Sequence, residues 1–231
     1  MPVEEISSSR RSSRTTVPLT RAHLRRLGAL ADDQHAELTR PPAQGGGLSA
    51  WASRRIAVVL AQGAALHYLH PDGPRDPRAW RRGVKDLDVW TFYAAIPGRP
   101  LRTGRYEGCR DFGPSSLGRN RYPTPHTGEM RRWNEFTGRR VDLLARDLPV
   151  DSDASIDVVV AALRSWLAAG AAKPCAHLQP NGRSPSPHWL AHKAMVWIGT
   201  PETRRRPGKK VWDVHTDAAN LLNVSGSAGS E

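Results

Sequence analysis

The sequence predicts an α/β protein in which helices flank one β-sheet. Segments 56–61, 84–96 and 139–145 are rich in β-branched, aromatic and aliphatic residues, which is typical of buried strands. Elsewhere, apolar residues recur three or four positions apart, and this spacing indicates amphipathic helices. At 231 residues, the chain has room for one sizeable domain with extra elements or tails.

The N-terminal region is predicted to lie outside the main domain. Residues 1–17 lack apolar mass and periodicity, so we expect a disordered segment. Residues 18–47 are expected to form a satellite helix and a linker, because Thr20 can cap a helix and the Pro- and Gly-rich stretch 41–47 breaks it. The apolar positions of this helix are Leu24, Leu27, Leu30 and Ala31.

The main domain is expected to span residues 48–215. Its first apolar run, 56–61, suits a strand that leads into Gly63 and a short helix over 64–69. One long helix over the same region is the alternative, because periodicity alone does not separate the two.

The rest of the domain follows a loop over 71–83. Residues 101–138 are rich in Gly, Arg and Pro and are too long for a simple loop in a compact domain, so we expect them to have a functional role. The remaining pattern predicts a turn at 97–100, a helix over 155–171 capped by Ser155, a short helix and strand over 188–199, and a tail over 216–231.

Charge and cysteine content limit the environment and the partners. The formal net charge of +12 favours a polyanionic partner such as nucleic acid, although an Arg-rich solvated surface is the alternative. Cys109 and Cys175 form no CxxC pattern, so we expect a reducing cytoplasm. No apolar run approaches the roughly 20 residues that cross a bilayer, so we expect no membrane association.

Two aspartates stand at the entrance of the strand over 84–96. Asp86 and Asp88 share a face with Trp90 and Phe92, because alternate residues of a strand point the same way. Unpartnered buried charges are costly. An isolated pair of this kind is therefore more often solvated or paired with neighbouring basic residues.

A third aspartate, Asp142, stands among apolar residues of the strand over 139–145. Two independent strands thus each carry an acid where burial is favoured. Three convergent carboxylates repel one another unless cations neutralise them. Mg²⁺ is a hard, oxygen-seeking ion that keeps waters and substrate phosphates as its other ligands. We therefore expect a two-ion Mg²⁺ site for in-line displacement at phosphorus.

Three motifs follow one another in an informative order. They are a Gly turn that opens a helix at 63–66, the Asp-Leu-Asp pair at 86–88, and the strand acid at 141–144. This order resembles the nucleotidyltransferase superfamily, which includes DNA polymerase β and the minimal nucleotidyltransferases, and residues 62–69 are especially similar to the turn of its AbiEii-like toxin branch. The resemblance covers about residues 50–145 and implies a small mixed sheet flanked by helices.

The resemblance also implies an activity: transfer of a nucleoside monophosphate from an NTP to a hydroxyl of RNA, such as tRNA, or of a protein, with release of pyrophosphate. Asp86 and Asp88 would hold Mg²⁺ ions and nucleotide phosphates, while Asp142 would complete the second metal site and help to deprotonate the acceptor. In the family, the Gly-[Gly/Ser] turn commonly supplies a hydroxyl that meets the nucleotide triphosphate. Here the turn reads Gly63-Ala64, so this hydroxyl is absent. The other residues implied to contact the nucleotide are Gly63, Ala64 and Lys85.

Two other functions stay open. The chain could keep the nucleotidyltransferase fold without turnover and act as a binding protein, such as a toxin–antitoxin component. It could also be a basic nucleic-acid-binding protein with structural acids, in which Trp80, Tyr122 or Trp133 stack on bases.

Several other motifs are weak. No P-loop is present, and the stretch 111–119 lacks the motifs that accompany Asp-Phe-Gly in kinases, so ordinary turn chemistry is favoured there. His188 and His192 lie four apart but without the Glu of a metalloprotease motif.

Overall fold

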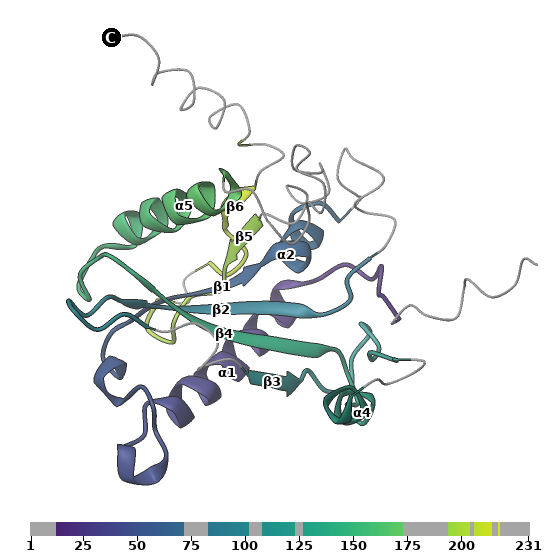
Figure 1. The fold of residues 1–231 in the computed structure, drawn as a ribbon. Coiled ribbons are helices and arrows are strands. Elements are labelled where there is room, and N and C mark those ends of the chain that lie inside the picture. The colour runs from purple at the N-terminus through teal and green to yellow at the C-terminus, as the bar shows by residue number, and fades with distance from the viewer. Residues whose placement is uncertain are drawn as a thin grey trace, which may run out of the picture.

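One six-stranded mixed sheet with helices on both faces organises the chain (Figure 1). The computed structural model describes residues 13–71, 83–101, 108–122, 127–172, 194–203, 206–213 and 217. Within these ranges the mixture of strands and helices confirms the α/β class predicted from the sequence.

The strands are β1 (Arg55–Ala61), β2 (Leu87–Ala94), β3 (Gly108–Asp111), β4 (Arg140–Leu148), β5 (Ala194–Trp197) and β6 (Lys210–Asp213). They lie side by side in the order β3-β4-β2-β1-β5-β6. The central pair β2 and β4 is parallel, whereas the other neighbouring pairs are antiparallel. The two strands that carry the aspartates are therefore direct neighbours.

The α-helices of the described ranges are α1 (Arg21–Leu38), α2 (Gln62–Leu69), α4 (Gly128–Asn134) and α5 (Ile156–Ala172). Two 3₁₀ turns, Pro42–Gln44 and Ser49–Trp51, lie between α1 and β1. Thr20 caps α1 as predicted, because its hydroxyl accepts a hydrogen bond from the His23 N–H at 3.3 Å. Ser155 does the same for α5 by accepting from the Val158 N–H at 3.4 Å.

The two faces of the sheet are covered by different helices. On one face, α1 and α2 bury Leu27 and Ala65 against strand residues such as Val89. On the other face, α5 buries Leu163 against Phe92, and the Trp166 ring meets the Trp90 ring edge-on at 5.4 Å. Figure 1 shows α5 and α1 on opposite sides of the sheet. Trp90 and Phe92 thus share one face of β2, as strand alternation predicts.

The junction of β1 and α2 settles the choice between a strand and one long helix. The apolar run ends in Ala61, and α2 begins at the next residue, Gln62. Gln62 has a φ of 55° and is one of two non-glycine residues in the described ranges with a positive φ. This left-handed conformation is costly for a side chain that has a Cβ atom. The turn that the sequence assigns to Gly63 therefore falls one residue earlier.

The segment 101–138 is not one irregular loop. It contains β3, which pairs with β4, and the short helix α4, which begins after the Thr127 cap. Asp111 ends β3, and its carboxylate accepts hydrogen bonds from three backbone N–H groups, namely those of Gly113, Thr137 and Gly138. This is the ordinary turn chemistry favoured for the Asp-Phe-Gly stretch.

The N-terminal prediction is wrong for the last five residues of the proposed disordered segment. Thr15 is buried and pairs with Val84 through backbone hydrogen bonds of 2.8 and 2.9 Å. Residues 13–17 are therefore part of the fold. Residues 1–12, most of the loop 71–83, the helix proposed from residue 188, most of the proposed tail, Cys175, His188 and His192 lie outside the described residues.

Candidate active site

Three side chains line up across neighbouring strands. Asp142 of β4 stands opposite Asp88 of β2 in the parallel register and opposite Cys109 of β3 in the antiparallel register. The Cys109 thiol donates a hydrogen bond to Asp142 Oδ1 at 2.9 Å, so their side chains lie on one face. Asp88 shares its face with Trp90 and Phe92, the face that α5 covers further along the strand.

Asp88 is half-buried near the start of β2. Burial raises its pKa, and the negative charges of Asp86 and Asp142 raise it further, to about 7. Among the described residues its carboxylate has no hydrogen-bond donor and no ion-pair partner within 4 Å. The sheet therefore holds an acid whose ionised form is disfavoured at the edge of a pocket.

Arg140 lies between the other two aspartates. Its Nε donates to Asp142 Oδ1 at 2.6 Å and its Nη2 donates to Asp142 Oδ2, while Nη2 also lies 3.9 Å from Asp86 Oδ2. Burial alone would lower the pKa of Arg140, but the bonds to Asp142 and the charge of Asp86 raise it above its usual value. The guanidinium therefore stays charged and lies near Asp142 of β4 and Asp86, the residue before β2.

A pocket of about 430 Å³ opens beside this cluster. Its walls include Asp88, Arg140 and Asp142 from the sheet, and Glu129, Arg132 and Trp133 from α4. The Arg140 guanidinium lies 3.8 Å from the centre of the Trp133 ring, which is close cation–π contact. One face of Trp133, which the sequence offered as a stacking residue for bases, is thus covered by Arg140.

Two residues that sequence reasoning missed fix the position of the acids. Asn120 is fully buried; its Oδ1 accepts from the Arg140 backbone N–H and its Nδ2 donates to the Lys85 carbonyl, both at 2.7 Å. The buried Arg139 guanidinium donates to the same Lys85 carbonyl at 3.3 Å and to the Leu117 carbonyl at 2.9 Å. The chain before Asp86 is therefore tied to the start of β4.

The sequence offered only an indirect signal for these two positioning residues. The length of the segment 101–138 marked it as functional, but nothing in its Arg- and Gly-rich pattern singled out Asn120. Arg139 looked like one of many surface cations, although its side chain is buried and three backbone carbonyls accept its hydrogen bonds.

Of the residues predicted to contact phosphate, Lys85 lies beside Asp86, whereas Gly63 and Ala64 make no described hydrogen bond to the three acids. Lys85 Nζ lies 3.5 Å from Asp86 Oδ2 and 5.6 Å from the centre of the Tyr122 ring. The start of α2 lies at the Asp88 end of β2, because Leu60 near the end of β1 pairs with Val89. Ala64 itself is buried on the opposite face of the sheet. Gly63 and Ala64 therefore lie at the same end of the sheet as Asp88.

The three acids do not offer a metal ion a complete set of ligands in this arrangement. Mg²⁺ needs oxygen atoms that are free to coordinate it. Asp142 gives both of its oxygens to Arg140, and one of them also accepts from Cys109. Within the described ranges, no group of three or more His, Cys, Asp or Glu side chains is placed to hold a metal ion. Asp86 Oδ2 lies 3.5 Å from Lys85 Nζ and 3.9 Å from Arg140 Nη2, so among the described residues Asp88 is the one acid of the three without a cation or donor within 4 Å.

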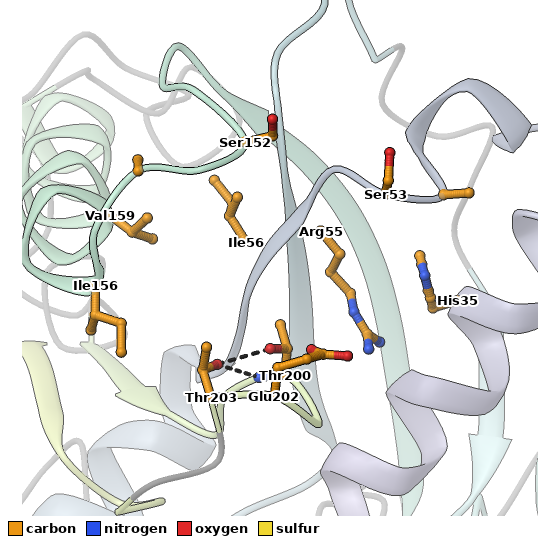
Figure 2. Close-up of a pocket in the computed structure, with 12 residues that line it drawn as sticks. His35, Ser53, Arg55, Ile56, Ser152, Ile156, Val159, Thr200, Glu202 and Thr203 are labelled. Atoms are coloured by element: carbon orange, nitrogen blue, oxygen red, sulfur yellow. Dashed lines mark hydrogen bonds between the residues drawn. The ribbon is translucent and has the colours of Figure 1, made fainter.

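A second pocket, of about 320 Å³, lies at the other end of β1 (Figure 2). Its main polar groups already have protein partners: Arg55 pairs with Asp32 at 2.9 Å, and the hydroxyls of Thr200 and Thr203 lie 2.9 Å apart. His35 contacts the Tyr93 hydroxyl at 3.0 Å, and burial lowers the pKa of His35 to about 4. A wall whose polar groups are bonded to other protein groups is less suited to phosphate chemistry than the acid cluster.

His67 of α2 and His70, the residue that follows this helix, also have structural roles. His67 contacts the Val17 carbonyl at 2.9 Å, and His70 contacts Asp213 at 2.6 Å. These contacts tie α2 to the N-terminal segment and to β6.

Comparisons with known proteins found no matching family model, no matching curated protein and no matching solved structure. In the part of the chain that the structure describes, none of the helices combines the length and apolarity needed to cross a bilayer.

Proposed function

We propose that this chain is a nucleotidyltransferase that acts at the pocket beside Asp88. The observation that carries the proposal is the parallel register of β2 and β4, which sets Asp88 opposite Asp142, with Asp86 and Asp142 both within 4 Å of one guanidinium. Acids far apart in the sequence are thus gathered at one pocket, as the resemblance to nucleotidyltransferases requires. Structural acids need no such convergence, because each can pair locally.

The reaction is transfer of a nucleoside monophosphate from an NTP to a hydroxyl group. The hydroxyl oxygen attacks the α-phosphorus, the bond from that phosphorus to the bridging oxygen breaks, and pyrophosphate leaves. The hydroxyl proton passes to a carboxylate, and Asp88 is better placed for this than Asp142, because its oxygens have no donor within the described residues. Mg²⁺ carried on the NTP phosphates would add positive charge there.

Arginines at the pocket support a polyanionic substrate. Arg132 lines the pocket directly, and Arg131, its neighbour in α4, is exposed. Arg119 and Arg121 are exposed on either side of Asn120, the residue that bonds to β4. An RNA acceptor fits these cations better than a neutral acceptor, since arginines pair with backbone phosphates.

The test is incorporation of label from each α-³²P NTP, with Mg²⁺ or Mn²⁺, into total RNA or lysate protein. The expected result is label on one class of acceptor with the wild-type chain and at least about a hundredfold less with Asp88→Asn, because a positioned general base contributes about that factor. Asp153→Asn, an exposed aspartate far along the chain from the site, is the matched control and should label normally.

Two outcomes would contradict the proposal. One is the absence of label with every NTP and both ions, together with no measurable NTP binding. The other is label that survives in both Asp86→Asn and Asp88→Asn, because the acids would then be irrelevant to the transfer.

A second candidate function is supported by Arg140. Its guanidinium neutralises Asp142 and Asp86, as expected for a protein that keeps the fold and binds nucleotide or nucleic acid without turnover. Binding of fluorescent NTP analogues separates the two candidates. Nucleotide binding without any label transfer, and without loss of binding in Asp88→Asn, would favour the binding protein.

A further inference from the structure

Arg140 and Asp142 stand two residues apart on β4, so both side chains project from the same face of the sheet. Arg140 uses its Nε and Nη2 edge to hold both oxygens of Asp142 in the bidentate geometry that carboxylates prefer. The side chain is 15% exposed and that of Asp142 is 16% exposed, so little water competes with this pair.

The pair is also fixed from three other directions. The Trp133 ring covers one face of the guanidinium, the Cys109 thiol donates to Asp142 Oδ1, and the buried Asn120 amide accepts the Arg140 backbone N–H. A salt bridge braced in this way is not the loose surface pair that an incoming ion displaces easily.

The rest of the guanidinium remains available to a ligand. Arg140 lines the pocket, and its Nη1 group has no acceptor among the described residues. Arg140 therefore has one edge on Asp142 and further N–H donors beside the pocket. This is the geometry in which an arginine fork holds a carboxylate on one side and a phosphate on the other.

We propose that Arg140, and not a metal ion, is the cation bound by Asp142, and that the cluster takes up one divalent ion, beside Asp88, rather than two. In the nucleotide transfer proposed above, on which this part of the inference rests, the guanidinium supplies the fixed positive charge at the phosphates that a second ion would otherwise supply. Arg140 is thus a substrate-positioning residue.

The number of bound ions tests this proposal without any measurement of activity. Mn²⁺ is titrated into the full chain, and free Mn²⁺ is counted from its electron paramagnetic resonance signal. The wild-type chain is expected to bind one Mn²⁺. Arg140→Met keeps an aliphatic side chain against Trp133 but frees Asp142, so this variant is expected to bind two.

A double variant and a control complete the test. In Arg140→Met/Asp142→Asn the second ion is expected to disappear, because its carboxylate is gone. Arg132 lines the same pocket and has no described contact with the acids. The control variant Arg132→Ala should therefore bind one ion, as the wild type does. Circular dichroism of each variant checks that it is folded.

Three results would overturn the inference. These are two ions, or none, on the wild-type chain, or the same single ion with unchanged affinity in Arg140→Met. The wild-type count is decisive even where a variant fails to fold. One bound ion with no label transfer would leave the inference standing and remove the enzymatic proposal, so the two failures are distinguishable.

Discussion

Asp88 shows at the level of a single residue how the site costs stability. Its ordinary pKa of 3.8 rises to about 7 in the folded protein, mainly through burial. The folded state therefore binds a proton more tightly than the unfolded state does, and stability is lost as the pH rises through this range. Such a cost is typical of residues retained for chemistry rather than for folding.

Replacing Asp88 by Asn is expected to stabilise the protein by about 1–3 kcal/mol at pH 8, because the charge that burial disfavours is removed. The gain should shrink as the pH falls towards 4, where the folded wild type holds the proton. Urea unfolding at several pH values measures both effects. A large loss of stability in Asp88→Asn would instead show a structural role for this carboxylate, and Asp153→Asn should change little.

The sequence predicted the gathering of the acids but not the residue that neutralises them. Strand alternation placed Asp86 and Asp88 on one face, and the structure sets Asp142 beside them. The same alternation puts Arg140 on the face of Asp142, yet sequence reasoning considered only cations next to the first pair. The bonds of Asn120 join residues 20 and 35 positions away from it, and no local pattern reveals such contacts.

The element that sequence reasoning resolved least is the segment between β2 and β4. β3 has four residues and α4 has seven, which is too short for a period of two or of 3.6 to emerge. The longer elements α1, β1, β2, β4 and α5 were all predicted, because their apolar patterns repeat several times. The shift of the turn from Gly63 to Gln62 shows that element boundaries depend on packing as well as on residue type.

Asp111 joins two parts of the segment between β2 and β4. Its replacement tests how much this connection stabilises the protein. Its carboxylate accepts four hydrogen bonds, three from backbone N–H groups and one from the Thr137 hydroxyl at 2.8 Å. Burial alone would raise the pKa of Asp111, but these bonds lower it below its ordinary value. Its stabilising effect is therefore present above about pH 4 and is lost as the pH falls further.

Replacing Asp111 by Ala is expected to cost about 2–4 kcal/mol of unfolding free energy at pH 7, because several donors lose a charged acceptor at once. Urea denaturation measures this loss, with Asp151→Ala as an exposed control. The loss should become smaller in acid, where the wild-type carboxylate is protonated. A variant as stable as the wild type would show that the bonds from Asp111 to Gly113, Thr137 and Gly138 do not stabilise the fold.

At the scale of the whole molecule, the layers explain why the site lies where it does. α5 covers β1, β2 and the outer strands but leaves the Asp88 end of β2 and β4 beside α4. The sequence predicted a sheet between helices, yet it could not show which helix covers which face, because both faces are apolar. The parallel pairing of β2 with β4 was not predicted, because the resemblance to nucleotidyltransferases implied only a small mixed sheet.

The net charge of +12 predicts binding to single-stranded RNA that weakens with salt. Fluorescence anisotropy is expected to show at least a tenfold rise in Kd between roughly 50 and 200 mM salt, because phosphate contacts release counterions. Removing Arg131 and Arg132 from α4 should weaken binding more than removing Arg21 and Arg25 from α1, which changes the net charge equally. Equal effects of the two double variants would show that the charge acts diffusely and not at the pocket.

The Asn120 amide has a consequence for the chain lengths that the fold tolerates. It fixes two points of the backbone, at Lys85 and Arg140. Residues inserted between Tyr122 and Thr127 are expected to cost little chain entropy and to leave both points in place. A single residue inserted between Lys85 and Asp88 would turn the start of β2 over and carry an aspartate to the opposite face. Length variants of this protein should therefore be functional when they differ between Tyr122 and Thr127 and inactive when they differ between Lys85 and Asp88.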